Sequence, residues 1–584
     1  MAEIAGDLWE SSHPGDTWEF SHPNEISSPQ NPVDQHTGGT DQENAELKAL
    51  EIELSQDPDN FEIWERLLNT TEAVDGGVTR NSHPQAIQMV RNVYDRLLTK
   101  FPLMFVYWKK YADREFGFAG TESADMIYER GVASIPTSVD LWASYCDFKV
   151  QTCHVVDEVR EIFSRGADSC GSDFLSHPFW DKYIEYEDRN ECPDKVFEIL
   201  ARLIRIPCHQ YTRYFQRYRS MSPNRPLVEL VAAEKLDEFR SEVTVKLGES
   251  AMESQIEHEL RLRIDNYYLE TFQTTQNETN IRWAFESEIK RPYFHVTELD
   301  ESELTNWWNY LDFEESQNVF ERTTFLYERC LVTCARYEKF WFRYARWMLA
   351  QEDKESHFDK QSNTRFIYQR ACAVFLPISE PKIRLQYSYT EEMADRTDLA
   401  IELHNSMLDN LPDHVDTINS LANMSRRDAG LDAAVQVYKK QIDSDKSAMT
   451  TKGILVAEWA RLLWKVQGTP DEARGVFQTY QQYYLDNRSF WSSYLLFEIE
   501  QPTSAATEHD HYKRIKEVMS EFESKSTVHP DVHVELVQIY MKYLLERGDK
   551  GATKEYMALD QKLYGPSHAK QIEGVSLSSA NLQY

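Results

Sequence analysis

The sequence predicts an all-α protein built as an α-solenoid, in which pairs of short helices repeat along the chain and stack on one another. The first observation is a Trp followed three residues later by Tyr, which occurs in six places. The second is the spacing: Trp142 follows Trp108 by 34 residues, and Trp341 follows Trp307 by 34. A period of about 34 residues with two helices per unit is typical of tetratricopeptide-like arrays. Glycine (20) and proline (21) are few for 584 residues, which disfavours an all-β chain.

The Trp-x-x-Tyr motif predicts the first helix of each repeat. Residues three and seven positions apart lie on one helical face, so each copy indicates an amphipathic helix. An alternative is that these rings stack RNA bases. Their regular recurrence favours the core instead. The predicted repeat-core residues are Trp108, Tyr111, Trp142, Tyr145, Trp180, Tyr183, Trp307, Tyr310, Trp341, Tyr344, Trp491 and Tyr494.

A second motif predicts the second helix of each repeat. It reads MIYERGV from Met126 and FLYERCL from Phe325, an aromatic residue followed by a polar residue, Arg and a small residue. Pro102, Pro136 and Pro412 fall just after such helices, where proline ends a helix without breaking it. Each repeat is therefore expected to contain two helices whose apolar faces are buried only by stacking on neighbours.

The pattern divides the chain into five parts. The start has four prolines among polar and acidic residues and no apolar periodicity, which indicates a disordered tail. The stretch 227–272 is charged, helical in pattern and free of Trp, which indicates a bridge between two arrays. The predicted parts are a tail (1–44), an amino-terminal array (45–220), a helical bridge (221–301), a carboxy-terminal array (302–564) and a flexible tail (565–584).

The chain is strongly acidic, with 63 Lys and Arg against 97 Asp and Glu and a net charge of −34. The chain is therefore a poor candidate for holding nucleic acid by general attraction to phosphate, so an RNA contact needs a local basic patch or a partner protein. The best basic patch interleaves arginines with tyrosines. Its arginines either contact RNA phosphate or a partner, or pair with acidic residues inside the array, and we favour the pairing. They are Arg202, Arg205, Arg213, Arg217 and Arg219.

Catalytic and metal-binding motifs are absent from the sequence. There is no Gly-rich phosphate loop, HExxH, GxSxG or calcium loop, and the eight cysteines include no Cys-x-x-Cys pair. We therefore expect no enzyme activity, cofactor or metal. No secretory signal and no membrane-spanning apolar stretch is visible, so the expected location is the cytoplasm or the nucleus.

The paired motifs resemble the half-a-tetratricopeptide (HAT) repeat, which is found in RNA-processing scaffolds. Two segments, FPLMFVYWKKYADREF (101–116) and KRPYFHVTELDESELTNWWNYLDFEE (290–315), resemble the pre-mRNA-processing factor 39 family. The run Arg291–His295 sets this resemblance apart from other HAT proteins. The resemblance implies a nuclear scaffold of the U1 small nuclear ribonucleoprotein (U1 snRNP) in the early spliceosome. Such a scaffold supports 5′ splice-site recognition in mRNA splicing through contacts with other U1 proteins, and any contact with U1 snRNA or pre-mRNA is mostly indirect.

The resemblance also implies a dimer, with a second copy or with a paralogue, formed by the carboxy-terminal repeats. The candidate dimer residues are Phe497, Tyr540 and Tyr543. Acidic runs such as Asp312–Glu315 are expected to be solvated helix faces, with docking of an Arg-rich partner as a further hypothesis.

Two alternatives stay open. One is a HAT scaffold of another RNA-processing complex, in mRNA 3′-end cleavage or ribosomal RNA processing. The other is a cytosolic tetratricopeptide-type adaptor that binds peptide termini without RNA. That class is expected to place Lys and Asn in its groove, whereas this chain has aromatic and Glu residues in its motifs.

Overall fold

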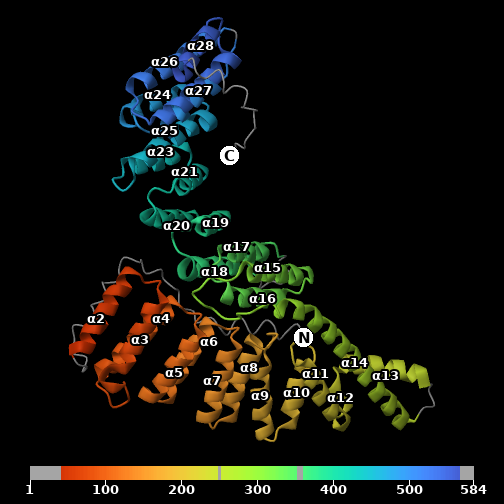
Figure 1. The fold of residues 1–584 in the computed structure, drawn as a ribbon. Coiled ribbons are helices and arrows are strands. Elements are labelled where there is room, and N and C mark those ends of the chain that lie inside the picture. The colour runs from red at the N-terminus through yellow and green to blue at the C-terminus, as the bar shows by residue number, and fades with distance from the viewer. Residues whose placement is uncertain (1–40, 248–251, 352–358, 505, 566–584) are drawn as a thin grey trace. The chain divides into compact units, whose positions relative to one another are not determined.

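A computed structural model shows a chain of helices, and no strand occurs in the residues that it describes (Figure 1). The described residues are 41–247, 252–351, 359–504 and 506–565. The predicted tails therefore lie outside them, apart from residue 565 and from residues 41–44, which begin the first described helix. The all-α prediction is confirmed.

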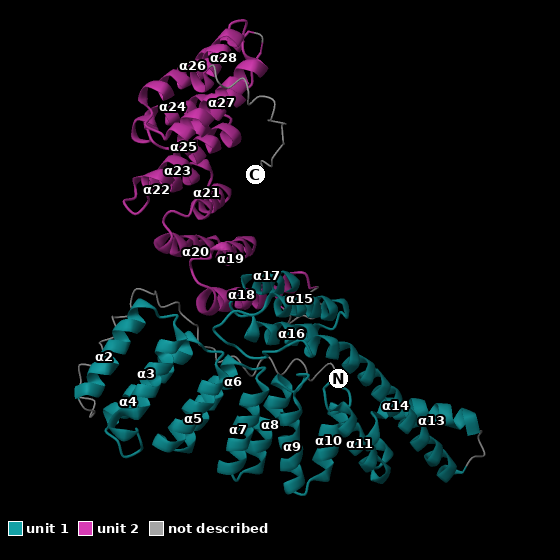
Figure 2. Cartoon of the chain, in the orientation of Figure 1, with its two compact units in different colours: residues 1–347, 354–358 teal, residues 348–353, 359–584 magenta. Residues whose placement is uncertain are grey.

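The chain forms two compact units, which Figure 2 colours separately. Unit 1 comprises residues 1–347 and 354–358, and unit 2 comprises residues 348–353 and 359–584. The division does not fall at the predicted bridge, which lies inside unit 1. Helix α17 (Glu338–Leu349) contains the boundary.

The helices are short, as expected for stacked repeats, except for one of 34 residues. In unit 1 they are α2 (Asp41–Gln56), α3 (Phe61–Ala73), η2 (Val74–Gly76), α4 (Pro84–Lys100), α5 (Phe105–Ala119), α6 (Thr121–Ser134), α7 (Val139–Thr152), α8 (Val156–Ser169), α9 (His177–Arg189), α10 (Pro193–Leu203), α11 (Tyr211–Met221), η3 (Ser222–Asn224), α12 (Leu227–Leu230), α13 (Ala233–Leu247), α14 (Glu253–Glu286), α15 (Glu301–Ser316) and α16 (Phe320–Thr333).

In unit 2 they are α18 (Lys360–Arg370), η4 (Ala371–Phe375), α19 (Lys382–Met393), α20 (Thr397–Asn410), α21 (Val415–Ala429), α22 (Leu431–Asp443), α23 (Met449–Leu462), η5 (Leu463–Gln467), α24 (Pro470–Tyr480), η6 (Gln481–Tyr483), α25 (Arg488–Glu500), α26 (Glu508–Lys525), α27 (Pro530–Arg547) and α28 (Ala552–Tyr564).

Proline and glycine set the ends of these helices. Helices α4, α6 and α20 each end two residues before a proline, at Pro102, Pro136 and Pro412. Gly120 alone connects α5 to α6 and Gly430 alone connects α21 to α22, with φ of 95° and 93°. Residues with a Cβ rarely adopt such angles, so glycine makes these one-residue connections possible.

Helix α14 already takes part in the packing of the repeats that follow it. Its last turn already behaves as the second helix of a repeat: Arg282 bonds to Glu314 of α15 at 2.6 Å, and Phe285 stacks on Tyr310 with ring centroids 4.9 Å apart. The same contacts join other repeats, as described below. The repeat pattern therefore resumes before residue 301, in a helix that lacks the Trp-x-x-Tyr motif.

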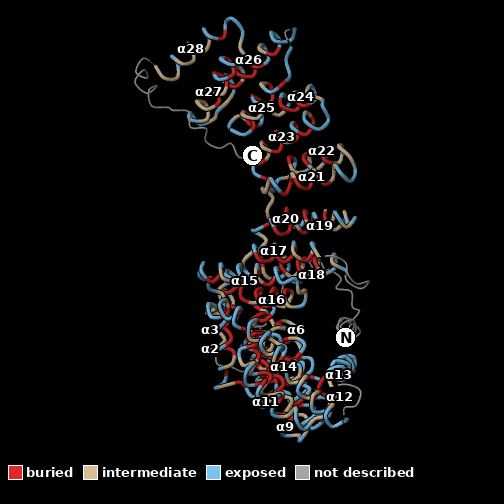
Figure 3. The backbone as a smooth tube through the Cα atoms, turned by 90° about the vertical axis from the view of Figure 1, so that its right-hand side faces the viewer, coloured by how far each residue is buried: buried red, intermediate tan, exposed pale blue. Residues whose placement is uncertain are grey.

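The core runs along both units instead of gathering at one centre, as Figure 3 shows. This distribution is expected when each repeat buries its apolar face against its neighbours. Of the predicted core residues, Tyr183 is only partly buried, and the other eleven are buried.

A buried ionic cluster joins distant parts of unit 1. The Arg329 guanidinium on α16 lies 2.8 Å from Asp173, in the loop between α8 and α9, and 2.5 Å from Glu286 at the end of α14. Tyr310 donates a further hydrogen bond to Glu286 at 3.0 Å. We call Asp173, Glu286 and Arg329 the Arg329 cluster. It fixes the amino-terminal repeats to the helices that follow the bridge.

The segment between α14 and α15 adds a second connection. Tyr293 contacts Phe105 at the start of α5, with ring centroids 6.4 Å apart. The Arg336 guanidinium lies 5.8 Å from the rings of both Phe101 and Phe294. The Arg291–His295 run therefore packs against the amino-terminal repeats, which gives this part of the sequence a structural role.

Candidate interaction surfaces

Several of the motif tryptophans fix loops to helices. The indole N–H of Trp108 donates to the Pro102 carbonyl at 2.8 Å, and that of Trp142 donates to the Pro136 carbonyl at 2.8 Å. Trp341 makes the same bond to the Ala335 carbonyl. These rings are buried and their donors are occupied, so they do not offer a surface for stacking bases.

Aromatic pairs connect each repeat to the next. Tyr94 of α4 stacks on Tyr111 of α5 at 4.6 Å between centroids, and Phe477 of α24 stacks on Tyr494 of α25 at 4.7 Å. The first ring belongs to the second motif and the other to the following Trp-x-x-Tyr motif. The two motifs therefore meet in one contact, and the joined face is not available to a partner.

Buried ion pairs accompany these rings, and the sequence analysis missed them. The acceptor in each pair is a glutamate seven residues after the motif Trp. The donor is an arginine of the preceding helix, three residues before the aromatic residue that stacks on the motif Tyr. The glutamate accepts two hydrogen bonds from this arginine. Glu187, for example, is fully buried and bonds to Arg160 at 2.8 Å. The equivalent pairs are Arg91–Glu115 and Arg474–Glu498, and Arg365–Glu391 has the same geometry in a helix with Arg384 in place of the motif Trp. The offset of Arg from the aromatic residue was visible in the sequence and could have indicated them.

The acidic run that begins at Asp312 is also used inside the array, contrary to the expectation of a solvated face. Glu314 is buried against Arg282, and both Asp312 and Glu315 bond to Arg343. This run does not present free carboxylates to a basic partner.

The predicted basic patch is mostly neutralised by neighbouring repeats. Arg202 bonds to Asp168 at 2.8 Å and stacks over Trp180 at 5.5 Å. The other paired arginines are Arg213 with Asp181, Arg217 with Asp188 and Arg219 with Asp265. Pairing shifts the pKa of Arg213 upward, mainly through the hydrogen bond to Asp181. The internal pairing favoured from the sequence thus describes four of the five residues.

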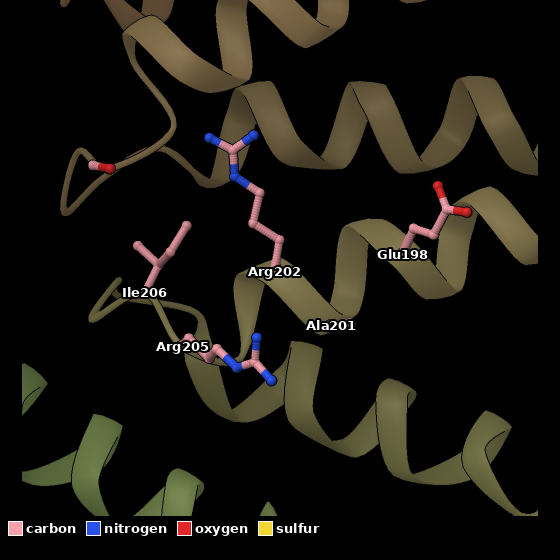
Figure 4. Close-up of a pocket in the computed structure, with 6 residues that line it drawn as sticks. Glu198, Ala201, Arg202, Arg205 and Ile206 are labelled. Atoms are coloured by element: carbon pink, nitrogen blue, oxygen red, sulfur yellow. The ribbon is translucent and has the colours of Figure 1, made fainter. Parts of the chain in front are cut away.

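Arg205 differs from the rest of the patch. It is exposed, and within the described residues its side chain makes no ion pair or hydrogen bond. It lines a surface hollow of about 520 Å³ together with Ser172, Glu198, Ala201, Arg202 and Ile206. Figure 4 shows that Arg202 and Arg205 leave the chain in different directions, so the two guanidinium groups do not converge on one ligand.

The candidate dimer residues lie inside unit 2. Phe497, Tyr540 and Tyr543 are all buried. The Tyr540 hydroxyl donates to Glu555 at 3.0 Å, and the Tyr543 hydroxyl lies 3.2 Å from the His511 ring nitrogen. These side chains stabilise the repeats, and a contact between chains needs other residues. Exposed apolar neighbours are Leu496 on α25 and Leu545 on α27, two helices that pack together.

Two further observations concern metals and membranes. In the part of the chain that the structure describes, no group of three or more His, Cys, Asp or Glu residues is arranged to hold a metal ion. Among the described helices, none combines the length and the apolarity that a membrane span requires.

Comparison with known proteins identifies the repeats. Residues 48–220 match the family described as PRP39 N-terminal HAT repeat, and residues 280–427 match the PRP39 C-terminal HAT repeat. The chain is similar to pre-mRNA-processing factor 39 of Schizosaccharomyces pombe, with 44% identity covering 91% of this chain and 89% of the relative. It is 30% identical to the Xenopus laevis protein of the same name, covering 76% and 69% of the two chains. It is also similar to the U1 small nuclear ribonucleoprotein component PRP42 of Saccharomyces cerevisiae, with 23% identity covering 54% and 59%.

Proposed function

Because the chain belongs to the pre-mRNA-processing factor 39 family of HAT-repeat splicing factors, we propose that it is a non-enzymatic structural scaffold of the U1 snRNP in the nucleus. In this role it supports 5′ splice-site recognition through contacts with other U1 proteins. The observation that carries the proposal is the similarity over 91% of the chain to a pre-mRNA-processing factor 39. The relative named as a U1 component supports the choice of particle.

Charge supports contacts with protein over contacts with RNA. The net charge of −34 repels phosphate, and four of the five patch arginines already pair with carboxylates. RNA therefore associates with this chain mostly through its protein partners.

The RNA that accompanies the protein tests this function. We expect U1 snRNA to dominate when the tagged chain is purified from its own cells at moderate salt and the bound RNA is sequenced. Untagged cells carried through the same purification provide the control. Dominant pre-ribosomal RNA or polyadenylation-site RNA would instead place the scaffold in another machine, and an absence of enriched RNA would favour the cytosolic adaptor.

The carboxy-terminal repeats are proposed to form a dimer, with a second copy or with a paralogue. Because Phe497, Tyr540 and Tyr543 are buried, we assign the contact to the exposed side chains beside them, Leu496 and Leu545. A two-fold contact of this kind is self-complementary, and an obligate one buries more than about 2,000 Å².

A charge placed on this surface is expected to separate the dimer. Leu545 is 58% exposed, so Leu545→Asp leaves the fold intact but puts a carboxylate into the interface, where burial without a partner is unfavourable. Light scattering after size-exclusion chromatography is expected to show about half the mass of the unaltered dimer. Met449→Asp, at an exposed apolar residue of α23, is the matched control and is expected to leave the mass unchanged. Equal masses for the two variants would remove Leu545 from the interface.

A further inference from the structure

One tryptophan stands apart from those of the repeats. Trp283 on α14 is 49% exposed, and its indole N–H has no hydrogen-bond partner among the described residues. Its ring centroid lies 5.7 Å from that of His209 and 6.1 Å from that of Phe174. A half-exposed Trp fixed by other rings is the type of residue that dominates protein recognition.

Two loops surround this ring. The loop between α8 and α9 carries the exposed Leu175, and the loop between α10 and α11 carries the exposed Arg205 and His209. The loops are joined by a hydrogen bond from the His209 N–H to the Phe174 carbonyl at 2.9 Å. The same two loops also line the hollow of about 520 Å³ described above. We call Leu175, Arg205, His209 and Trp283 the Trp283 patch.

The charge of the Trp283 patch differs from that of the chain as a whole. Three carboxylates on the elements around it have one cation each, namely Asp168 with Arg202, Asp181 with Arg213 and Glu198 with Lys195, whereas the buried Asp173 and Glu286 share Arg329. Arg205 is left unmatched. The Trp283 patch itself thus contains one unmatched guanidinium beside aromatic rings and no carboxylate, which complements a segment bearing carboxylates and rings, and the exposed Glu288 lies five residues after Trp283.

The chain itself contains such a segment. Residues 1–40 include seven Asp and Glu residues and no Lys or Arg. They carry two copies of the pattern Trp-Glu-x-Ser-His-Pro, at Trp9–Pro14 and Trp18–Pro23. Each copy provides a carboxylate for an arginine, and a proline and an indole for packing on an aromatic ring. Proline-bearing segments bind aromatic surfaces because their extended backbone loses little entropy on binding.

We propose that residues 1–40 bind the Trp283 patch of the same chain, with Glu10 or Glu19 facing Arg205 and the adjoining Trp and Pro residues packing on Trp283. Asp41 begins α2, so Glu19 can reach roughly 75 Å and Glu10 roughly 105 Å from it along an extended chain, more than the summed length of three repeat helices. Tethering holds the segment at an effective concentration on the order of millimolar, so a contact of modest affinity is populated. Two copies of the pattern double the number of binding segments. A partner that uses this surface has to displace the segment first.

Photo-crosslinking of the full chain tests the contact. Phe20, inside the second copy, is replaced by benzoylphenylalanine, and the crosslinks formed on irradiation are located by mass spectrometry. We expect them in residues 170–176, 204–210 or 276–286 of the same chain. Arg205→Glu and Trp283→Ala are each expected to lower their yield at least about fivefold, as for residues central to a contact.

Matched variants control for general effects of charge and ring loss. Arg514→Glu alters an exposed arginine of unit 2, and Trp308→Ala removes a tryptophan that is 37% exposed. Both are expected to leave the yield unchanged. Crosslinks confined to other surfaces would overturn the proposal, and so would an equal loss of yield in the control variants. Crosslinks found only between chains, in a mixture of isotopically labelled and unlabelled protein, would make a second copy the occupant and likewise overturn it. The test uses purified protein without RNA, so its result is independent of the proposed function.

Discussion

Replacing Arg329 with Met is expected to lower the stability of unit 1 by about 3–5 kcal/mol, because it leaves two buried carboxylates without their cation. Asp173 and Glu286 are both buried, and they come from elements far apart in the sequence. Methionine keeps most of the side-chain volume, so the loss of stability comes from the missing charge more than from missing packing contacts. Hydrogen exchange of the full chain measures this loss of stability. It gives opening free energies for single helices, which unfolding of a multi-unit chain as a whole does not.

Arg217→Met is the matched control for this variant. Arg217 lies 2.7 Å from Asp188, as close as the bonds in the Arg329 cluster, but the two side chains are 41% and 45% exposed. Solvent screening limits such pairs to less than about 1 kcal/mol. A loss in Arg329→Met no larger than that in Arg217→Met would show that the cluster contributes little to holding unit 1 together.

The pH dependence of the Arg329→Met variant gives a second test. Burial raises the pKa of Asp173 above its usual 3.8, and the Arg329 charge opposes this rise. Without Arg329 the pKa is expected to rise further. A carboxyl whose pKa is raised on folding favours the folded state at low pH, and this contribution is lost as pH increases through the folded pKa. The free energy of unfolding that the variant loses relative to the unaltered protein should therefore be larger at about pH 8 than at about pH 5.

Contacts between adjacent repeats could be predicted from the sequence because the same residue types recur at the same spacing in successive repeats. The repeat core follows from the Trp-x-x-Tyr spacing, and two of the four pairs of the basic patch follow a similar offset. Arg202 and Asp168 are 34 residues apart, and Arg213 and Asp181 are 32 apart, each about one repeat. The offset of about one repeat could therefore have predicted these two pairs.

Contacts made once in the molecule leave no such pattern. The Arg329 cluster joins residues 173, 286 and 329, which no period relates. The buried position of Tyr540 and Tyr543 was equally hard to predict, because an aromatic ring in a core and one in a dimer contact look alike in sequence. Trp283 has no motif around it, and its exposure comes from the packing of α14.

The adjacent residues Trp307 and Trp308 show how strongly a shift of one residue along a helix changes the burial of a side chain. Trp307 belongs to the motif face with Tyr310 and is fully buried, whereas Trp308 is 37% exposed and lies beneath the Arg343 guanidinium at 4.5 Å. The Trp307 indole N–H has no hydrogen-bond partner among the described residues, so its contribution is packing. Trp307→Ala is expected to cost about 3–5 kcal/mol, as for other buried large-to-small substitutions.

Trp308→Ala removes the same atoms one residue later and is expected to cost about 1 kcal/mol, mainly through the lost contact with Arg343. Hydrogen exchange in α15 and α16 measures both losses. In a solenoid each repeat contacts only its neighbours, so the Trp307→Ala loss should be greatest in these two helices. Similar losses for the two variants would mean that burial along the motif face does not determine stability. The core assignment of the Trp-x-x-Tyr motif would then fail in the repeat that contains α15.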